Sequence, residues 1–214
     1  WLLFGRDRIP KNPPKSVKTI PVRQWSRAEM IRDPLFWVAS FGYLSPPFIG
    51  TAIFFHQVYM VELKGWDLSW FASGFSLYAL TTLIFGLVTG FGVDRFSARA
   101  MLPFFLLPLS AALLVLGLFD SPWSIPVIFV LMGLNGGGFS TLFGALWPEI
   151  YGVRHLGEIR SLIVAMMVFA SALGPGVIGW LIDYGIPLET QFLTMAAYCI
   201  VTSGVLFGVS RALI

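Results

Sequence analysis

The chain has 214 residues, of which 57% are hydrophobic and only 12% are charged, whereas a soluble domain carries about a quarter charged residues. This composition excludes an ordinary soluble domain. The formal net charge of +3 does not indicate nucleic-acid binding, because the positions of the basic residues are those that orient a membrane protein.

The first 34 residues differ in composition from the rest of the chain. Residues 1–4 are apolar and are typical of the end of a transmembrane helix, which stops at Gly5 and Arg6. Residues 5–34 are polar, basic and rich in proline, which predicts a cytoplasmic linker between helical regions. The chain has no initiator Met and no signal-peptide pattern, so we expect it to be truncated.

Six apolar runs, each long enough to cross a membrane, follow this segment. A helix needs about 20 mostly apolar residues to span the hydrocarbon core, and backbone polar groups in lipid must find their partners within the segment. The runs cover residues 35–59, 68–93, 100–119, 125–147, 162–182 and 191–210. The predicted fold class is therefore an all-α membrane protein, with one six-helix bundle over residues 35–214.

The basic residues predict how this bundle is oriented. Thirteen of the 14 Lys and Arg residues lie before the first run, in the second and fourth loops, or at the C-terminal end, and Lys64 alone lies on the other side. Lys and Arg are retained on the cytoplasmic side. We therefore expect a multi-pass protein of the cell (inner) membrane with both termini in the cytoplasm.

The first run contains a candidate surface for binding a solute. Pro46 and Pro47 lack N–H groups and should kink the helix by leaving carbonyls unpaired. The predicted face, defined by spacings of three and four residues, contains Tyr43, Pro47, Gly50, Phe54 and Gln57. The alternative is a kink that serves only to pack the helix against its neighbours.

Two further polar side chains lie in apolar runs. His56 can titrate near neutral pH and could bind solute, pass a proton or bridge an outer gate; alternatively, it bonds a loop near the interface. Asn135 lies within a stripe of small residues that permits close helix contact, formed by Gly133, Gly137, Ser140 and Gly144. Asn135 either faces the solute pathway or bonds the backbone of a neighbouring helix.

Charged and catalytic groups are absent from the interior of the predicted helices. All 11 acidic residues lie in loops or at helix ends, and no Lys or Arg lies deep in a helix to bind an organic anion. The sequence contains no G-x-S-x-G, H-E-x-x-H or Cys/His metal-ligand spacing, and Cys199 is a lone cysteine in the sixth run. We expect no enzyme, no catalytic residue, no metal site and no cofactor.

The second loop carries the clearest motif, Gly90-x-x-x-Asp94-Arg95-x-Ser97-x-Arg99. It resembles the G-x-x-x-D-R-x-G-x-R loop signature of the major facilitator superfamily, with Ser97 in place of the usual glycine. The resemblance implies a cytoplasmic gate formed by Gly90, Asp94, Arg95 and Arg99. Gly90 would let two helices approach closely, and Asp94 would cap or pair with a basic group of a neighbouring bundle. The alternative is that the arginines only anchor the loop in the cytoplasm.

Other segments extend this resemblance over essentially the whole chain. Residues 32–44 resemble the entry to the seventh helix of these transporters, and residues 146–161 resemble the loop between the tenth and eleventh helices in the monocarboxylate and oxalate/formate branch. Charged residues of that loop, including Glu149, are expected to contribute to topology and to the gate. The lack of buried charge argues against the carboxylate branch.

Residues 170–183 resemble the bent fifth helix of each half, which implies a hinge at Gly174, Pro175 and Gly176. Gly179-x-x-x-Asp183 repeats the spacing of Gly90 and Asp94, as inverted 3+3 repeats would.

The resemblance implies that the chain is the C-terminal half of a twelve-helix transporter. Such a protein would move a small organic solute by alternating access, and its partners would be the solute, the lipid bilayer and the missing N-terminal six-helix half. The alternative is a self-contained six-helix scaffold or a channel-like oligomer.

Overall fold

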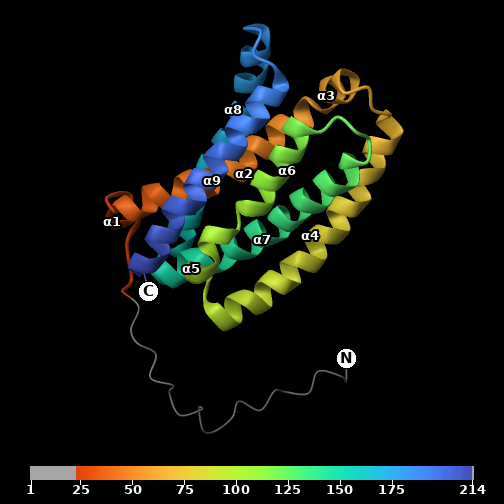
Figure 1. The fold of residues 1–214 in the computed structure, drawn as a ribbon. Coiled ribbons are helices and arrows are strands. Elements are labelled where there is room, and N and C mark those ends of the chain that lie inside the picture. Colours follow the sequence, from red (N-terminus) through yellow and green to blue (C-terminus); the bar gives the residue numbers. More distant parts are fainter. Residues whose placement is uncertain (1–22, 214) are drawn as a thin grey trace, which may run out of the picture.

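The computed structural model describes residues 23–213, and the six predicted spans are confirmed as helices (Figure 1). Residues 1–4 and most of the predicted linker lie outside the described part. The spans are α2 (Pro34–Phe55), α4 (Leu68–Phe96), the interrupted helix of α5 (Ala98–Met101), η1 (Leu102–Phe104) and α6 (Leu107–Leu118), α7 (Ser124–Tyr151), α8 (Leu156–Asp183) and α9 (Leu188–Leu213). Two short helices, α1 (Arg27–Ile31) and α3 (Gln57–Leu63), complete the described residues, which contain no strand.

Some helix boundaries differ from the predicted ones. The first span ends at Phe55 and restarts as α3 after His56, and the third span is interrupted near Pro103 and Pro108. The predicted loop over residues 148–161 is mostly helical, because α7 continues to Tyr151 and α8 starts at Leu156. Charged residues occupy the ends of both helices there, so the length of an apolar run underestimates the length of the helix.

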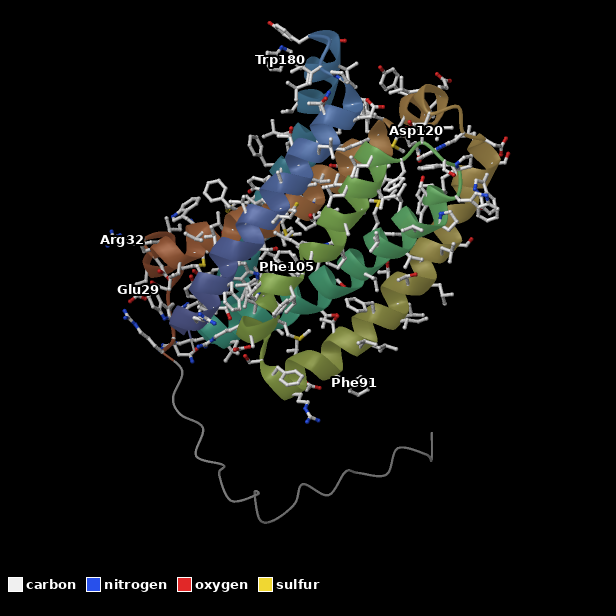
Figure 2. All side chains as sticks on the ribbon, in the orientation of Figure 1. Glu29, Arg32, Phe91, Phe105, Asp120 and Trp180 are labelled. Atoms are coloured by element: carbon white, nitrogen blue, oxygen red, sulfur yellow. The ribbon has the colours of Figure 1, made fainter. Side chains whose placement is uncertain are left out.

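The helices are packed mainly in pairs. α4 lies along α7, α2 lies along α8, and α6 packs against both α7 and α9 (Figure 1). Large apolar side chains such as Phe91 and Trp180 point away from the bundle, while Phe105 lies inside it (Figure 2). An apolar exterior of this kind is expected for helices surrounded by lipid.

Small residues set the distance between α4 and α7. A Cβ atom added at Gly137 would lie 2.5 Å from the Thr82 carbonyl oxygen and 2.6 Å from the Gly86 nitrogen. Thr141 Oγ1, one turn further along α7, donates a 3.1 Å hydrogen bond to the Gly86 carbonyl. The two backbones therefore meet directly along part of the predicted small-residue stripe. Gly144, by contrast, faces open space.

Candidate functional site

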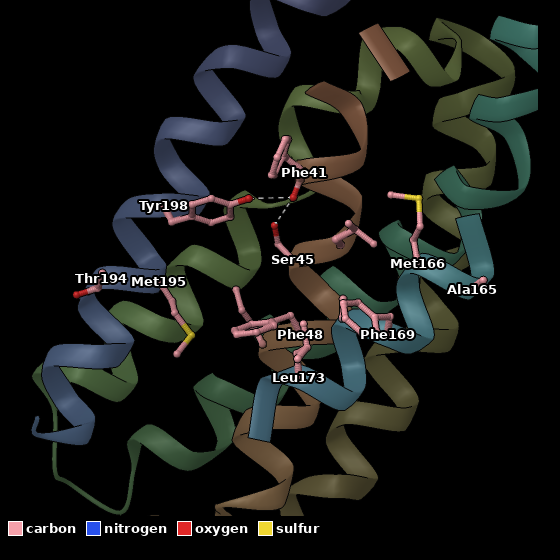
Figure 3. A pocket seen from close by; sticks show the side chains of 13 residues that line it. Phe41, Ser45, Phe48, Ala165, Met166, Phe169, Leu173, Thr194, Met195 and Tyr198 are labelled. Atoms are coloured by element: carbon pink, nitrogen blue, oxygen red, sulfur yellow. Dashed lines mark hydrogen bonds between the residues drawn. The ribbon is translucent and has the colours of Figure 1, made fainter. Parts of the chain in front are cut away.

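The larger of two described cavities is an apolar crevice between α2, α8 and α9, with a volume of about 720 Å³ (Figure 3). Its three hydroxyl groups already donate to backbone carbonyls. Ser45 and Tyr198 donate to the Phe41 oxygen at 2.9 and 3.0 Å, and Thr194 donates to the Thr190 oxygen at 2.8 Å. The remaining lining is aromatic, aliphatic or thioether. This crevice suits hydrocarbon better than a polar solute.

The smaller cavity, of about 200 Å³, lies beside the double proline of α2 and between α2, α4 and α7; we call it the α2–α7 cavity. Four residues predicted for the solute pathway, Pro47, Gly50, Phe54 and Asn135, line it together with Tyr78. It combines a hydroxyl, an amide and a proline-interrupted backbone with apolar walls. Sites for small molecules typically combine mostly apolar walls with a few polar groups, so the α2–α7 cavity is the better candidate for binding a solute.

The other predicted pathway residues lie outside this cavity. Tyr43 is fully buried in an aromatic cluster, with its ring centroid 5.2 Å from that of Phe105 and 5.3 Å from that of Trp147. His56 lies past the last turn of α2, where Nδ1 is 3.1 Å from the Ala52 oxygen. Gln57 follows it as the first residue of α3. Their part in a solute pathway stays a prediction.

Asn135 stabilises an irregular stretch of backbone as well as lining the cavity. It is 5% exposed, and its Nδ2 donates a 2.7 Å hydrogen bond to the Phe105 carbonyl. Phe105 lies between η1 and α6, where the third span is interrupted. The contact favours the expectation that Asn135 bonds a neighbouring backbone, since an unpaired carbonyl in a membrane is costly.

The predicted hinge at Gly174, Pro175 and Gly176 lies in an unbroken α8 where this helix contacts α2. A Cβ atom at Gly174 would come 2.3 Å from the Phe48 carbonyl oxygen. Pro175 has no N–H, which deprives the Ser171 carbonyl of its helical partner, and Thr51 Oγ1 lies 2.9 Å from that oxygen. One of the three predicted hinge residues, Gly174, thus lies at a close backbone contact between α2 and α8.

Thr51 links the proline sites of the two helices. Its Oγ1 is also 2.6 Å from the carbonyl oxygen of Pro47. A hydroxyl has one proton, so Thr51 donates either within α2 or across to α8.

The turn between α4 and α5 is bound to the ends of two other helices. Glu149 of α7 accepts a 2.8 Å hydrogen bond from the Ala98 nitrogen, and its Oε1 lies 3.1 Å from Arg99 Nε. Ser210 of α9 donates a 2.7 Å bond to the Arg99 carbonyl. Two of the predicted gate elements, Arg99 and the charged end of α7, are therefore in direct contact.

The other predicted gate residues make few contacts with the rest of the described bundle. Asp94 and Arg95 are exposed, and Asp94 forms no ion pair with a described residue. Nothing lies within 4 Å of a Cβ atom added at Gly90. The close helix contact expected at Gly90 is thus absent within this bundle. One turn earlier on the same face of α4, Gly86 meets the backbone of α7 instead, so the close contact between the two helices ends before Gly90.

The comparison with known families agrees with the fold and the loop motif. The family model of the Major Facilitator Superfamily matches residues 48–213. The chain belongs to the Major Facilitator Superfamily. Members of this superfamily are integral membrane transporters of small solutes, so this chain is a multi-pass membrane protein of a transport family. No curated protein matches the chain.

Ser97 occupies the glycine position of the superfamily loop motif and is strained there. Its φ of 78° and ψ of 154° lie in a region that is almost restricted to glycine and that costs other residues about 1–3 kcal/mol. Its Oγ accepts a 3.3 Å hydrogen bond from the Ala100 nitrogen, which offsets part of this cost.

Ser97→Gly should raise the free energy of unfolding by about 1 kcal/mol. Glycine removes the backbone strain, and the loss of the side-chain cap costs only a few tenths of a kcal/mol. Thermal unfolding of the purified protein in detergent measures the effect. Ser97→Ala keeps the strain and loses the cap, so it should be less stable than the wild type. Equal stability of the two variants would refute this explanation.

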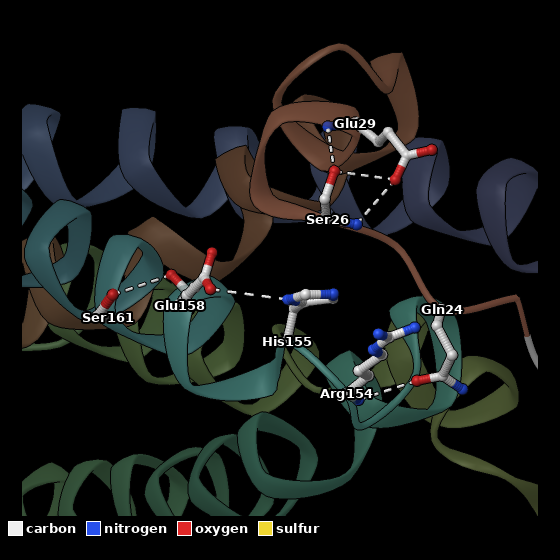
Figure 4. A network of polar contacts seen from close by, with 7 residues as sticks. All are labelled: Gln24, Ser26, Glu29, Arg154, His155, Glu158 and Ser161. Carbon is white, nitrogen blue, oxygen red and sulfur yellow. Dashed lines mark hydrogen bonds and ion pairs between the residues drawn. The ribbon is translucent and has the colours of Figure 1, made fainter.

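The segment before α2 is attached to the loop between α7 and α8 (Figure 4). Gln24 Oε1 accepts hydrogen bonds of 2.9 Å from the nitrogens of Val153 and Arg154. The Trp25 nitrogen donates to the Tyr151 oxygen at 3.0 Å, and the Tyr151 hydroxyl donates to Asp33 at 2.9 Å. The C-terminal part of the predicted linker therefore packs on the bundle.

The helix α1 within this segment starts with a capping box. Ser26 and Glu29 exchange hydrogen bonds between side chain and backbone. Backbone and side-chain hydrogen bonds from Ser26, followed by one from Arg23, lower the pKa of Glu29 to about 2. Because this pKa is lowered, the stabilisation is complete above the ordinary value of 4.5 and is lost as the pH falls towards 2.

Proposed function

We propose that this chain is the C-terminal half of a transporter that moves a small organic solute across the membrane by alternating access. The observation that carries the proposal is the α2–α7 cavity, where Tyr78 and Asn135 face a proline-interrupted stretch of α2. In this superfamily fold, solute would bind near the middle of the membrane while the two halves rock around it. Rocking about the contact of Gly174 with α2 is consistent with this mechanism.

Two helices offer surfaces for the missing N-terminal half. Only 11% of the membrane window of α4 and 22% of that of α8 is buried, compared with 39–50% in the other four spans. The exposed face of α4 also carries Ser69, Ser73 and Ser76, hydroxyl residues that suit a helix interface better than lipid. A second six-helix bundle packed on α4 and α8 would cover these faces.

Asp94 supports the same partner. It lies in the last turn of α4, where the helix dipole disfavours a negative charge. A helix N-terminus or a basic group of the N-terminal half would stabilise it there, and this contact would form in only one of the two transport conformations. Together with the pair Arg99 and Glu149, it would form a gate on the cytoplasmic side. The excess of basic residues at this end supports an orientation with both termini in the cytoplasm, in the plasma (inner) membrane of the cell.

A test of transport uses the complete protein in liposomes. The vesicles are incubated with a mixture of small metabolites, and their contents are identified by mass spectrometry. We expect at least one organic solute to enter protein-containing vesicles faster than empty ones. Gly50→Trp should abolish this uptake, because Gly50 lines the cavity and the space beside it is open.

The matched control is Gly204→Trp, which places the same side chain at an exposed and equally open position of α9. Its uptake should equal that of the wild type. A scaffold would give no uptake, and a channel-like oligomer would be insensitive to Gly50→Trp. Either result would contradict the proposal.

A further inference from the structure

A small space beside Gly136 is bordered by two hydroxyl groups of α4. A Cβ atom added at Gly136 would lie 3.1 Å from the Tyr78 hydroxyl oxygen and 3.3 Å from Thr82 Oγ1. Gly136 and Tyr78 both line the α2–α7 cavity, and Thr82 lies next to Gly136. A side chain at Gly136 would therefore crowd the Tyr78 hydroxyl, which can donate and accept hydrogen bonds.

The hydroxyl of Thr82 has an unused hydrogen-bonding capacity. Its oxygen is shielded from solvent and has no hydrogen-bond partner among the described residues. The neighbouring Thr81 instead donates a 2.7 Å bond to the Leu77 carbonyl, as threonine in a helix commonly does. A buried polar atom without a partner is costly, so a methyl group at Gly136 would press against an oxygen that is already unsatisfied.

The walls of the cavity are apolar and partly aromatic. Phe54 and Tyr78 pack edge to face, with ring centroids 6.0 Å apart and an angle of 76° between the rings. Phe139 and Met132 form the wall on α7. Aromatic side chains in such arrangements favour planar apolar groups.

No charged side chain lines this cavity. Every charged residue of the described chain lies in a loop or near a helix end. A charged group bound here would lose its hydration without gaining a counter-ion, which is strongly unfavourable.

The geometry points to a subsite for the uncharged, planar part of a solute, which carries a neutral oxygen or nitrogen that hydrogen-bonds the Tyr78 hydroxyl. Gly136 determines this specificity by leaving the space open. The inference rests on the function proposed above and names the class of solute that this half would accept. A carboxylate would have to be bound elsewhere in the complete protein.

Benzamide is a suitable probe, because it is planar and uncharged and its amide both donates and accepts hydrogen bonds. Its binding to the complete protein in detergent can be measured by equilibrium dialysis of the radiolabelled compound. We expect binding that Gly136→Ala weakens about tenfold and Tyr78→Phe weakens about fivefold, which corresponds to the loss of one hydrogen bond. Tyr78→Phe keeps the ring and removes only the hydroxyl.

The control variant is Gly144→Ala, on the same helix but in open space, and it should bind benzamide as the wild type does. Benzoate and benzylammonium have the same ring but carry a charge, so they should not bind at this subsite. If they bind elsewhere on the protein, Gly136→Ala should change their affinities less than twofold. The inference is overturned if benzamide does not bind, or if Gly136→Ala and Tyr78→Phe bind it as tightly as the wild type does. It is also overturned if Gly136→Ala weakens the binding of a charged analogue as much as that of benzamide.

The two proposals can fail separately. If the liposomes take up no solute but benzamide binds with this pattern, the transport proposal fails and the subsite stands. If uptake is observed but the benzamide pattern is absent, only the subsite is wrong.

Discussion

Gly137→Ala is expected to lower the free energy of unfolding of the bundle by about 3 kcal/mol, at the upper end of the usual cost of overpacking. The added methyl group would lie 2.5 Å from the Thr82 carbonyl oxygen and 2.6 Å from the Gly86 nitrogen. Both are backbone atoms of α4, so no side chain can rotate away, and the two helices must separate. Their separation would also break the hydrogen bond from Thr141 to Gly86.

Denaturation of the purified protein by SDS in mixed micelles, followed by tryptophan fluorescence, measures this loss. Gly144→Ala is the matched control, because the same substitution two turns further along α7 meets open space. Its stability should remain within about 0.5 kcal/mol of the wild type, as for most surface changes. Equal stability of the two variants would show that the contact between α4 and α7 is not as close as described.

Glu149→Gln should reduce the initial rate of solute uptake by the complete protein about tenfold. The Glu149 carboxylate binds both the Ala98 nitrogen and the Arg99 guanidinium, and both partners are part of the loop that we propose closes the cytoplasmic side. A hydrogen bond to a charged group contributes about 1.5–3 kcal/mol, so its loss shifts a closing equilibrium by tenfold or more. The amide retains the shape of the side chain and removes its charge.

Uptake into liposomes measures this effect, and Arg154→Gln is the control. Arg154 is an exposed residue at the same end of the bundle, and its side chain forms no ion pair with a described residue. The control should transport at the wild-type rate. An unchanged rate in Glu149→Gln would mean that the loop has no part in the gate and only anchors the chain.

The number and approximate position of the spans could be predicted from the sequence because the length of an apolar run is a direct consequence of bilayer thickness. The internal breaks were harder to place, since they depend on proline positions within runs that are uniformly apolar. Pro103 and Pro108 were visible signals of the interrupted third span. Ser26 and Glu29 form the spacing of a capping box, and this pattern could have predicted α1.

The candidate site was predicted only in part, because helical periodicity defines a face but not what covers it. The spacing on α2 placed Pro47, Gly50 and Phe54 on one face, and all three line the cavity. It could not show that Tyr43 packs into an aromatic cluster instead. Tyr78 was missed, since an aromatic residue in an apolar run most often packs against its neighbours.

A pattern that pairs two helices could have identified Tyr78. Tyr78, Thr82 and Gly86 recur every four residues on α4, as Gly133, Gly137 and Thr141 do on α7. Two matching stripes of this kind predict a close helix pair. Residues at the edge of the stripes, such as Gly136, then lie beside the cavity.

Alternating access requires that the α2–α7 cavity opens to the two sides of the membrane in turn. Gly50→Cys places a thiol at the cavity wall, in a complete protein whose other cysteines, including the buried Cys199, are replaced by serine. The measurement is the rate of its reaction with a membrane-impermeant maleimide in right-side-out and inside-out vesicles, with and without Glu149→Gln.

Alternating access predicts that the thiol is labelled from both sides. Glu149→Gln should raise the labelling rate from the cytoplasmic side and lower it from the external side, because a weaker cytoplasmic closure favours the conformation open to the cytoplasm. Absence of labelling from either side, or a change of both rates in the same direction, would contradict the account.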